Sequence, residues 1–134
     1  MSAKAKYLVT GGAGFIGSNL VAALTAAGER VRVLDNLSTG FWQNLDGIPK
    51  QSQIERITGD IRDAEAAAKA CDGVEVVFHE GALGSVPKSV ELPIESDSVN
   101  VNGTVTMLDC ARRQGVKRFL FAASSAAYGE TEEL

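Results

Sequence analysis

Short apolar runs alternate along the chain with longer stretches in which apolar residues recur every three or four positions. The short runs predict five strands, over residues 6–9, 30–34, 54–58, 74–78 and 118–122. The longer stretches predict helices over residues 15–27, 64–70 and 94–114. Strands that alternate with helices indicate parallel βαβ units with right-handed crossovers. We therefore predict an α/β fold with a doubly wound parallel sheet of five strands, ordered 3-2-1-4-5, and helices on both faces.

The two longer predicted helices each carry an apolar face. On the first, this face is formed by Ile16, Leu20, Leu24 and Ala27. On the longest helix, it is formed by Val101, Val105, Leu108 and Ala111. We expect both faces to pack against the sheet. Gly28 and Gly115 follow these helices, where a C-terminal cap is expected, and Asp63 is positioned to cap the helix over residues 64–70.

The composition is that of an ordinary globular protein, with 45% hydrophobic and 22% charged residues. A chain of 134 residues indicates one domain, over residues 1–134. There is no apolar run near the about 20 residues that span a bilayer, so we predict no membrane segment. The amino-terminal residues lead directly into the first strand without an apolar stretch and a cleavage site, and we therefore expect a cytoplasmic protein.

Charge and cysteine content exclude some partners. A net charge of −4 argues against nucleic acid as a main partner, because binding to phosphate backbones needs clustered cations. Four cations do cluster near the end of the longest predicted helix, where they suit the helix dipole: Arg112, Arg113, Lys117 and Arg118. Cys71 and Cys110 stand apart from each other and from His79, the only histidine, so we predict no metal site and two reduced packing residues.

A glycine-rich stretch, Thr-Gly-Gly-Ala-Gly-Phe-Ile-Gly over residues 10–17, lies between the first strand and the first helix. Read from Gly12 it is Gly-x-Gly-x-x-Gly, and read from Gly11 it has glycines at every third position. Without Cβ atoms the chain can turn tightly, bring backbone N–H groups close to a pyrophosphate, and pack the helix against the sheet. A plain structural turn could show the same glycines. The strand before it, the helix after it, and Asp35 at the end of the second strand, 18 residues beyond Gly17, favour a dinucleotide-binding turn.

The chemically suggestive segments all follow predicted strands. They are residues 11–17, 35–40, 60–61, 79–89 and 124–128. A doubly wound sheet binds its ligands outside the carboxyl ends of its strands, near the switch between the first and fourth strands. We therefore expect these segments to converge on one edge of the sheet.

These segments resemble the extended short-chain dehydrogenase/reductase family, and within it the NAD-dependent nucleotide-sugar epimerases and dehydratases, which have a Rossmann fold. The glycine-rich stretch carries the resemblance together with Leu-Asp-Asn-Leu-Ser-Thr-Gly from Leu34, Gly-Asp-Ile-Arg-Asp from Gly59, Asn-Val-Asn-Gly-Thr from Asn100 and Ser-Ser-Ala-Ala-Tyr-Gly from Ser124. The resemblance covers the whole chain.

The resemblance implies a site for NAD. Its pyrophosphate would lie at Gly11, Gly14, Phe15, Ile16 and Gly17, its adenosine ribose at Asp35 and Asn36 with Ser38, Thr39 and Gly40 nearby, its adenine at Asp60 and Ile61, and further contacts would come from Gly81, Ala82 and Asn100. A carboxylate at position 35 can accept both ribose hydroxyls but would repel the extra phosphate of NADP, and Asn36 adds no positive charge. The plainer alternatives are a solvated strand end at Asp35 and a turn at Asp60 and Ile61.

The segment that follows His79 is similar to the substrate-side loop of UDP-N-acetylhexosamine 4-epimerases. By this similarity Gly84, Ser85, Val86 and Ser89 would contact a UDP-sugar, together with Ser124 and Ser125. Pro87 would stiffen the loop, although such segments are also common connectors. Glu80 departs from the family pattern, and its carboxylate would oppose cofactor phosphates unless it turns to solvent. We interpret His79 as a packing residue.

Ser124 aligns with the family's catalytic serine, but the family's base belongs to a Tyr-x-x-x-Lys unit. Tyr128 is the only tyrosine near Ser124, and Glu132 stands four residues beyond it. The chain also lacks the family's carboxyl-terminal substrate domain. We therefore expect the amino-terminal, NAD-binding portion of a UDP-hexose or UDP-N-acetylhexosamine 4-epimerase, inactive alone.

Three alternatives stay open. One is a stand-alone NAD-binding module for assembly, another is part of a nucleotide-sugar dehydratase or decarboxylase, and the third is an enzyme completed by a second chain. Phe119, Leu120 and Phe121 would make the fifth strand an apolar sheet edge, so we expect self-association through it. A clean monomer at high concentration would contradict this expectation.

Overall fold

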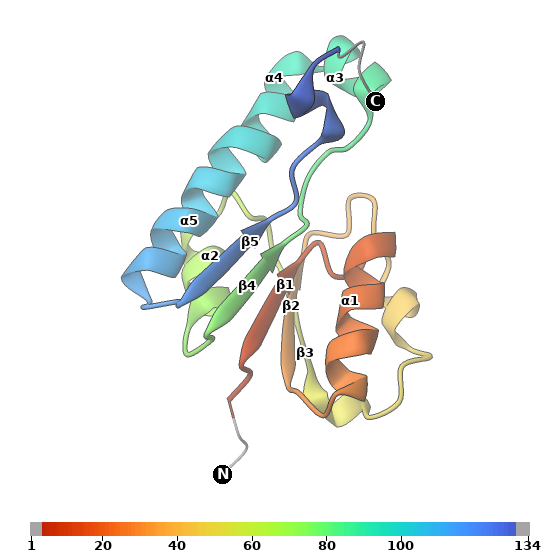
Figure 1. The fold of residues 1–134 in the computed structure, drawn as a ribbon, viewed down its shortest axis with the longest axis vertical. Coiled ribbons are helices and arrows are strands. Elements are labelled where there is room, and N and C mark those ends of the chain that lie inside the picture. The colour runs from red at the N-terminus through yellow and green to blue at the C-terminus, as the bar shows by residue number, and fades with distance from the viewer. Residues whose placement is uncertain (1–3, 131–134) are drawn as a thin grey trace.

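A single parallel sheet forms the centre of the computed structural model, which describes residues 4–130 (Figure 1). Its strands are β1 (Tyr7–Thr10), β2 (Val31–Asp35), β3 (Ile54–Thr58), β4 (Val76–His79) and β5 (Arg118–Phe121). Their order is β3-β2-β1-β4-β5, and every neighbouring pair is parallel. The predicted fold class, strand number and strand order are confirmed.

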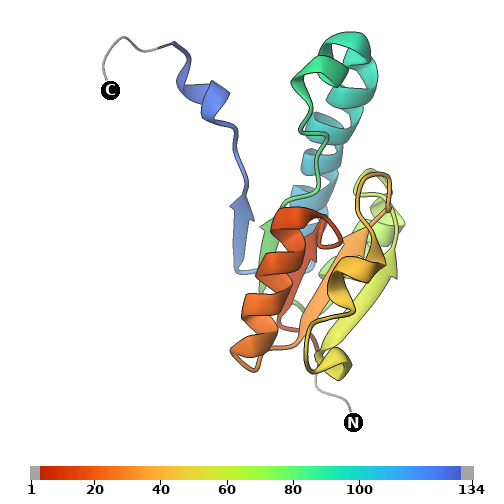
Figure 2. The same cartoon turned by 90° about the vertical axis from the view of Figure 1, so that its right-hand side faces the viewer.

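Helices cover both faces of this sheet. They are α1 (Phe15–Ala26), α2 (Ala64–Cys71), α3 (Val86–Glu91), α4 (Pro93–Asp97) and α5 (Gly103–Arg113), with a π-helical segment, η3 (Ser98–Asn102), joining α4 to α5. Short 3-10 turns complete the list: η1 (Trp42–Leu45), η2 (Gln51–Gln53) and η4 (Ser125–Tyr128). Helix α1 and η1 pack on one face, and α2 and α5 pack on the other (Figure 2). The longest predicted helix is therefore three consecutive helical segments.

The predicted core face of the longest helix is wrong for three of its four residues. Val101, Val105 and Leu108 are exposed, whereas Ala111 is buried as predicted, together with Met107 and Cys110. The reason is Gly103, which lies so close to the neighbouring loop that a Cβ there would be 2.6 Å from Cδ1 of Ile61. The missing side chain at position 103 selects the face that packs, and this rotates the larger apolar residues toward solvent.

The predicted face of α1 is partly correct. Leu20 and Leu24 pack against the core, whose buried members from this helix are Gly17, Val21 and Thr25. Ile16 is 62% exposed, because it belongs to the first turn of the helix, at the edge of the sheet where ligands are expected. Its exposure agrees with the cofactor role that the family resemblance implies rather than with a core role.

A buried arginine joins β2 to the end of α2. Arg32 is 7% exposed, and its Nε donates to Glu55 Oε2 at 2.9 Å. Its Nη1 donates to the carbonyl oxygens of Ala70 and Asp72, both at 2.8 Å, and of Lys69 at 3.2 Å. The guanidinium therefore satisfies carbonyls that a helix end leaves without partners.

Arg32→Met is expected to lower the free energy of unfolding by about 2 kcal/mol, because the buried carbonyl of Ala70 loses its charged donor. Urea denaturation would measure the change. Arg118→Met is the control, since Arg118 is exposed on β5. Equal effects of the two substitutions would contradict this role of Arg32.

Both cysteines, Cys71 and Cys110, are free and buried between α2 and α5, and burial raises the pKa of the Cys71 thiol to about 11. Among residues 4–130, no three His, Cys, Asp or Glu side chains gather closely enough to hold a metal ion. Within the same residues, no helix has the length and apolar character needed to cross a membrane.

Self-association through β5 stays a prediction. Leu120 and Phe121 on this strand are exposed.

Candidate functional site

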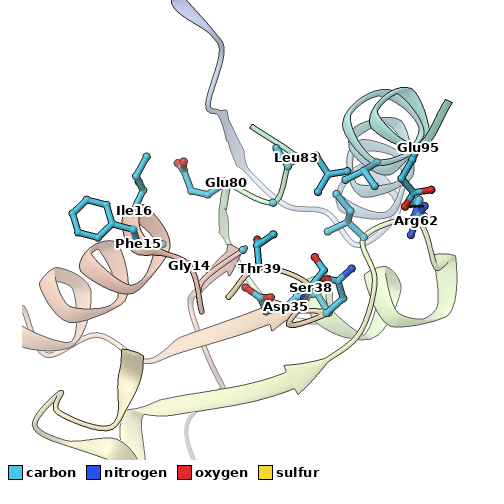
Figure 3. A pocket seen from close by; sticks show the side chains of 18 residues that line it. Gly14, Phe15, Ile16, Asp35, Ser38, Thr39, Arg62, Glu80, Leu83 and Glu95 are labelled. Carbon is cyan, nitrogen blue, oxygen red and sulfur yellow. Dashed lines mark hydrogen bonds and ion pairs between the residues drawn. The ribbon is translucent and has the colours of Figure 1, made fainter. Parts of the chain in front are cut away.

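A cavity of about 460 Å³ lies at the carboxyl ends of the strands (Figure 3). Most of the residues predicted to contact a cofactor line it: Gly11, Gly14, Phe15, Ile16, Gly17, Asp35, Asn36, Ser38, Thr39, Ile61, Gly81 and Ala82. The remaining lining residues are Leu34, Arg62, Glu80, Leu83, Glu95 and Val99. Of the segments predicted to converge, residues 11–17, 35–40, 60–61 and the first part of 79–89 contribute to this cavity, whereas residues 124–128 do not.

Three glycines of the turn have different reasons to lack a side chain. Gly11 has φ +65, and a Cβ there would be 2.9 Å from the backbone of Gly81. A Cβ at Gly17 would be 2.2 Å from the Gly11 carbonyl oxygen. At Gly14 the nearest atom, the same oxygen, is 3.2 Å away, so the fold needs glycine less there. Gly14 lines the cavity, and its missing side chain leaves room for a ligand.

The amino terminus of α1 faces this cavity. Its N-cap residue, Gly14, makes no side-chain hydrogen bond, and no acidic residue stands in the first turn. Backbone N–H groups at such a helix end attract negative charge, because they lack partners within the helix. The geometry suits a phosphate group.

Asp35 is held in place by the backbone on both sides. It is 8% exposed, its Oδ2 accepts from the backbone N of Ala13 at 3.0 Å, and its Oδ1 accepts from the N of Leu37 at 2.8 Å. Each carboxylate oxygen can accept a further hydrogen bond. The carboxylate of Asp35 at the strand end is therefore buried and fixed, and it is not a solvated side chain.

The residues after Asp35 form a compact loop. Asn36 accepts from the N of Ser38 at 3.0 Å and donates through Nδ2 to Asp60 Oδ2 at 3.0 Å. Gly40 is not among the lining residues, because it packs behind the glycine turn, where a Cβ would be 2.8 Å from the carbonyl carbon of Ala13. Gly40 therefore lies behind the glycine turn and not at the cavity surface, where the ribose contact was predicted.

Arg62 is a cavity residue that the sequence analysis missed. Its guanidinium donates to Asp60 Oδ1 and Oδ2 at 2.9 and 2.8 Å, and to Glu95 Oε1 at 3.1 Å. The hydrogen bonds from Arg62 hold the pKa of Asp60 well below its usual range. Asp60 itself is not among the lining residues and acts on the cavity wall through Arg62 and Asn36. The signal for Arg62 was present in Gly-Asp-Ile-Arg-Asp, but its distant partner Glu95 was not predictable.

A second cavity, of about 430 Å³, lies beside the first. It is lined by Gly84, Ser85, Val86, Ser89 and Ser124, and also by Asn100, Thr104, Phe121 and His79. The contact of the first five residues with a substrate stays a prediction. Ser125 is not among the lining residues; it begins η4, which Ser124 caps by accepting from the N of Ala126 at 3.1 Å. Residues 80–83 line both cavities and separate them.

The expected loop over residues 84–89 is wrong, because most of it forms helix α3. Ser85 caps this helix by accepting from the N of Lys88 at 3.4 Å, and Pro87 stands in the first turn, where its missing N–H costs nothing.

Glu80 does not turn fully to solvent: it is half-buried, and it lines both cavities. Asn100 lines the second cavity and not the first, and its cofactor contact stays a prediction.

Known proteins resemble the chain over nearly its full length. UDP-glucose 4-epimerase of Streptomyces lividans is 42% identical over 132 residues, which are 96% of this chain and 39% of that protein. The structure of UDP-N-acetylglucosamine 4-epimerase from Methanobrevibacter ruminantium M1, in complex with UDP-N-acetylmuramic acid, superposes with a TM-score of 0.87 and 36% identity, over 98% of this chain and 42% of that one.

A dTDP-glucose 4,6-dehydratase double mutant from Streptomyces venezuelae, with NAD and DAU bound, superposes with a TM-score of 0.89 and 36% identity, over 95% of this chain and 42% of that one. The chain thus spans about two fifths of the length of these relatives. Residues 7–134 match the family described as the NAD dependent epimerase/dehydratase family. Because this match covers nearly all of the chain, which also has the parallel sheet and the glycine-lined cavity, the chain belongs to the NAD dependent epimerase/dehydratase family.

Proposed function

We propose that this chain is the NAD-binding portion of a nucleotide-sugar 4-epimerase that acts on a UDP-hexose or a UDP-N-acetylhexosamine. The observation that carries the proposal is the first cavity, where the uncapped end of α1 and the fixed carboxylate of Asp35 lie on either side of the glycine turn. The epimerases among the similar proteins support the substrate class. The free, buried thiols fit the proposal of a cytoplasmic protein.

The cavity offers matching groups for the pyrophosphate and for one ribose of a dinucleotide. The N–H groups at the start of α1 would hold the pyrophosphate, and the remaining lone pairs of Asp35 would accept the ribose hydroxyls. The cavity's lining cation, Arg62, is already bonded to Asp60 and Glu95, so it is not free to neutralise the additional phosphate of NADP. NAD is therefore the preferred dinucleotide.

The second cavity would hold the sugar beside the cofactor, since residues 80–83 border both. When bound, NAD supplies a hydride acceptor that can return the hydride. Ser124 lies where it can hold a sugar hydroxyl by a hydrogen bond. Neither tyrosine in the chain is followed by lysine at the fourth position, so we propose that these 134 residues do not epimerise UDP-glucose or UDP-N-acetylglucosamine alone.

Gly14→Ala and Asp35→Ala are each expected to raise the Kd for NAD at least about tenfold, which corresponds to about 1.4 kcal/mol. A methyl group at Gly14 would intrude on the pyrophosphate, while its nearest protein atom at 3.2 Å lets the fold persist with a small shift. Calorimetric titration of NAD measures both effects. Gly47→Ala is the control, because no atom lies within 4 Å of a Cβ there. Equal affinity in all the variants would exclude NAD binding at this site.

A second candidate is the equivalent portion of a nucleotide-sugar dehydratase, which the likeness to dTDP-glucose 4,6-dehydratase favours. Titration of the NAD-loaded chain with UDP and with dTDP separates the two candidates by the nucleotide preferred. A chain that binds NAD but neither nucleotide would instead support a stand-alone binding module.

A further inference from the structure

A closed ring of hydrogen bonds lies beneath the wall between the two cavities. It begins at the N–H of Gly81, which donates to Thr10 Oγ1 at 3.0 Å, and continues from Thr10 Oγ1 to His79 Nδ1 at 2.8 Å. His79 Nε2 lies 2.9 Å from Thr104 Oγ1, which donates to the carbonyl of Asn100 at 2.7 Å. The side chain of Asn100 then returns to the wall at Leu83.

One placement of the protons satisfies every contact of this ring. The Asn100 carbonyl can only accept, so the single hydroxyl proton of Thr104 is used there. His79 Nε2 must therefore be the donor to Thr104 Oγ1, which leaves Nδ1 as the acceptor for the Thr10 hydroxyl. The geometry assigns the neutral Nε2–H tautomer to His79. Burial, which lowers the pKa of His79 to about 4, agrees with a neutral ring.

Asn100 bonds the wall in both directions. Its Oδ1 accepts from the N of Leu83 at 2.8 Å, and its Nδ2 donates to the carbonyl of Leu83 at 3.0 Å. Asn100 lies in the π-helical segment η3, and π-helical turns within helices are often found at functional sites. The segment between Gly81 and Leu83 is thus held at both ends by one network that spans β1, β4 and the helix leading into α5.

We propose that His79, Thr104 and Asn100 are positioning residues that fix the wall over residues 80–83, and with it the place where a dinucleotide in the first cavity meets a substrate in the second. The identity of these two ligands rests on the proposed function, whereas the ring itself does not. His79 therefore has a proposed role beyond the packing that the sequence indicated.

The tautomer can be tested directly, because His79 is the only histidine in the chain. In protein labelled with ¹⁵N-histidine, we expect at neutral pH one ring nitrogen without a proton, Nδ1, and one protonated nitrogen, Nε2. The assignment would be overturned by an Nδ1–H tautomer or by the averaged signal of a freely exchanging ring. NAD is not needed for this measurement, so a failure of the proposed function leaves its result interpretable.

Thr104→Val tests the positioning role, since it keeps the shape of the side chain and removes the oxygen. We expect the amides of Gly81 and Leu83 to lose at least about tenfold in hydrogen-exchange protection, and Thr104→Ser to restore it. The amides of β1 should keep their protection, which shows that the variant is folded. Thr106→Val, on the same helix but outside the ring, is the matched control. Unchanged protection in Thr104→Val, or an equal loss in Thr106→Val, would refute the role.

The effect of this ring on NAD binding can be measured separately from the amide protection. Thr104→Val is expected to weaken NAD binding about tenfold in calorimetry, and Thr104→Ser to restore the affinity. Lost amide protection with unchanged NAD affinity would contradict positioning of the cofactor by this ring. Failure of the wild-type chain to bind NAD would instead contradict the proposed function, while the amide protection would still report on the ring.

Discussion

Gly17→Ala is expected to destabilise the protein more than any other single methyl group added to the glycine turn. The new Cβ would lie 2.2 Å from the Gly11 carbonyl oxygen and 2.6 Å from the Gly12 Cα, and both are backbone atoms that cannot rotate away. Either the turn or α1 must move. Overpacking costs about 1–3 kcal/mol, and we expect about 3 kcal/mol here because the clash is with backbone atoms, which is a large part of the stability of a domain. Thermal and urea denaturation followed by circular dichroism would measure the loss.

The comparison with two other glycines makes this prediction specific. Gly47→Ala adds the same methyl group where no atom lies within 4 Å, and it should leave the denaturation midpoint unchanged. Gly14→Ala should retain the fold and bind NAD at least about tenfold more weakly. If Gly17→Ala unfolded at the wild-type temperature, the close packing of α1 on the turn would be incorrect.

Stability is expected to fall as the pH decreases from about 6.5 to about 4, by about 3 kcal/mol in total. His79 is 2% exposed, and burial lowers its pKa from 6.5 to about 4. Below pH 6.5 the unfolded chain binds a proton at this imidazole and the folded protein does not, so acid favours unfolding. Below about pH 4 both states are protonated there, and this contribution stops growing. Urea denaturation across this range would measure the slope.

Other titrating groups act in a different range. The pKa values of Asp60, Glu75 and Asp109 are lowered by their cationic partners, so their stabilising effect is lost only as the pH falls below their ordinary values of 3.8 to 4.5. His79→Gln should therefore flatten the profile between pH 6.5 and 4.5. A folded-state titration of His79 near pH 6.5, seen by NMR, would contradict the prediction.

The sheet was predictable because its central strands are apolar runs that are buried on both faces, and because turns and helices separate them in a regular order. Asp35 was also predictable, since the last residue of such a strand lies at the ligand edge. Both properties are local in the sequence. The family resemblance added the cofactor residues around the glycine turn, and most of them line the cavity.

Features that depend on distant partners were not predictable. Arg62 belongs to the site because Asp60 and Glu95 hold it there, and Glu95 is 33 residues away. The packing face of α5 follows from Gly103 meeting Ile61, which a count of apolar residues cannot reveal. Helix α3 was missed because Pro87 was interpreted as a loop residue, although proline is equally suited to the first turn of a helix.

The wall over residues 80–83 has a thermodynamic consequence for titrations of this protein. Residues 80–83 border both cavities, so a ligand that shifts this segment from one cavity changes the surface that a ligand in the other cavity contacts. The two affinities are then linked, and the factor by which each ligand tightens the other must be equal in both directions. Two independent dissociation constants therefore do not describe this pair of cavities. The quantity that does is a coupling free energy, which is obtained by titrating one ligand with and without saturation by the other.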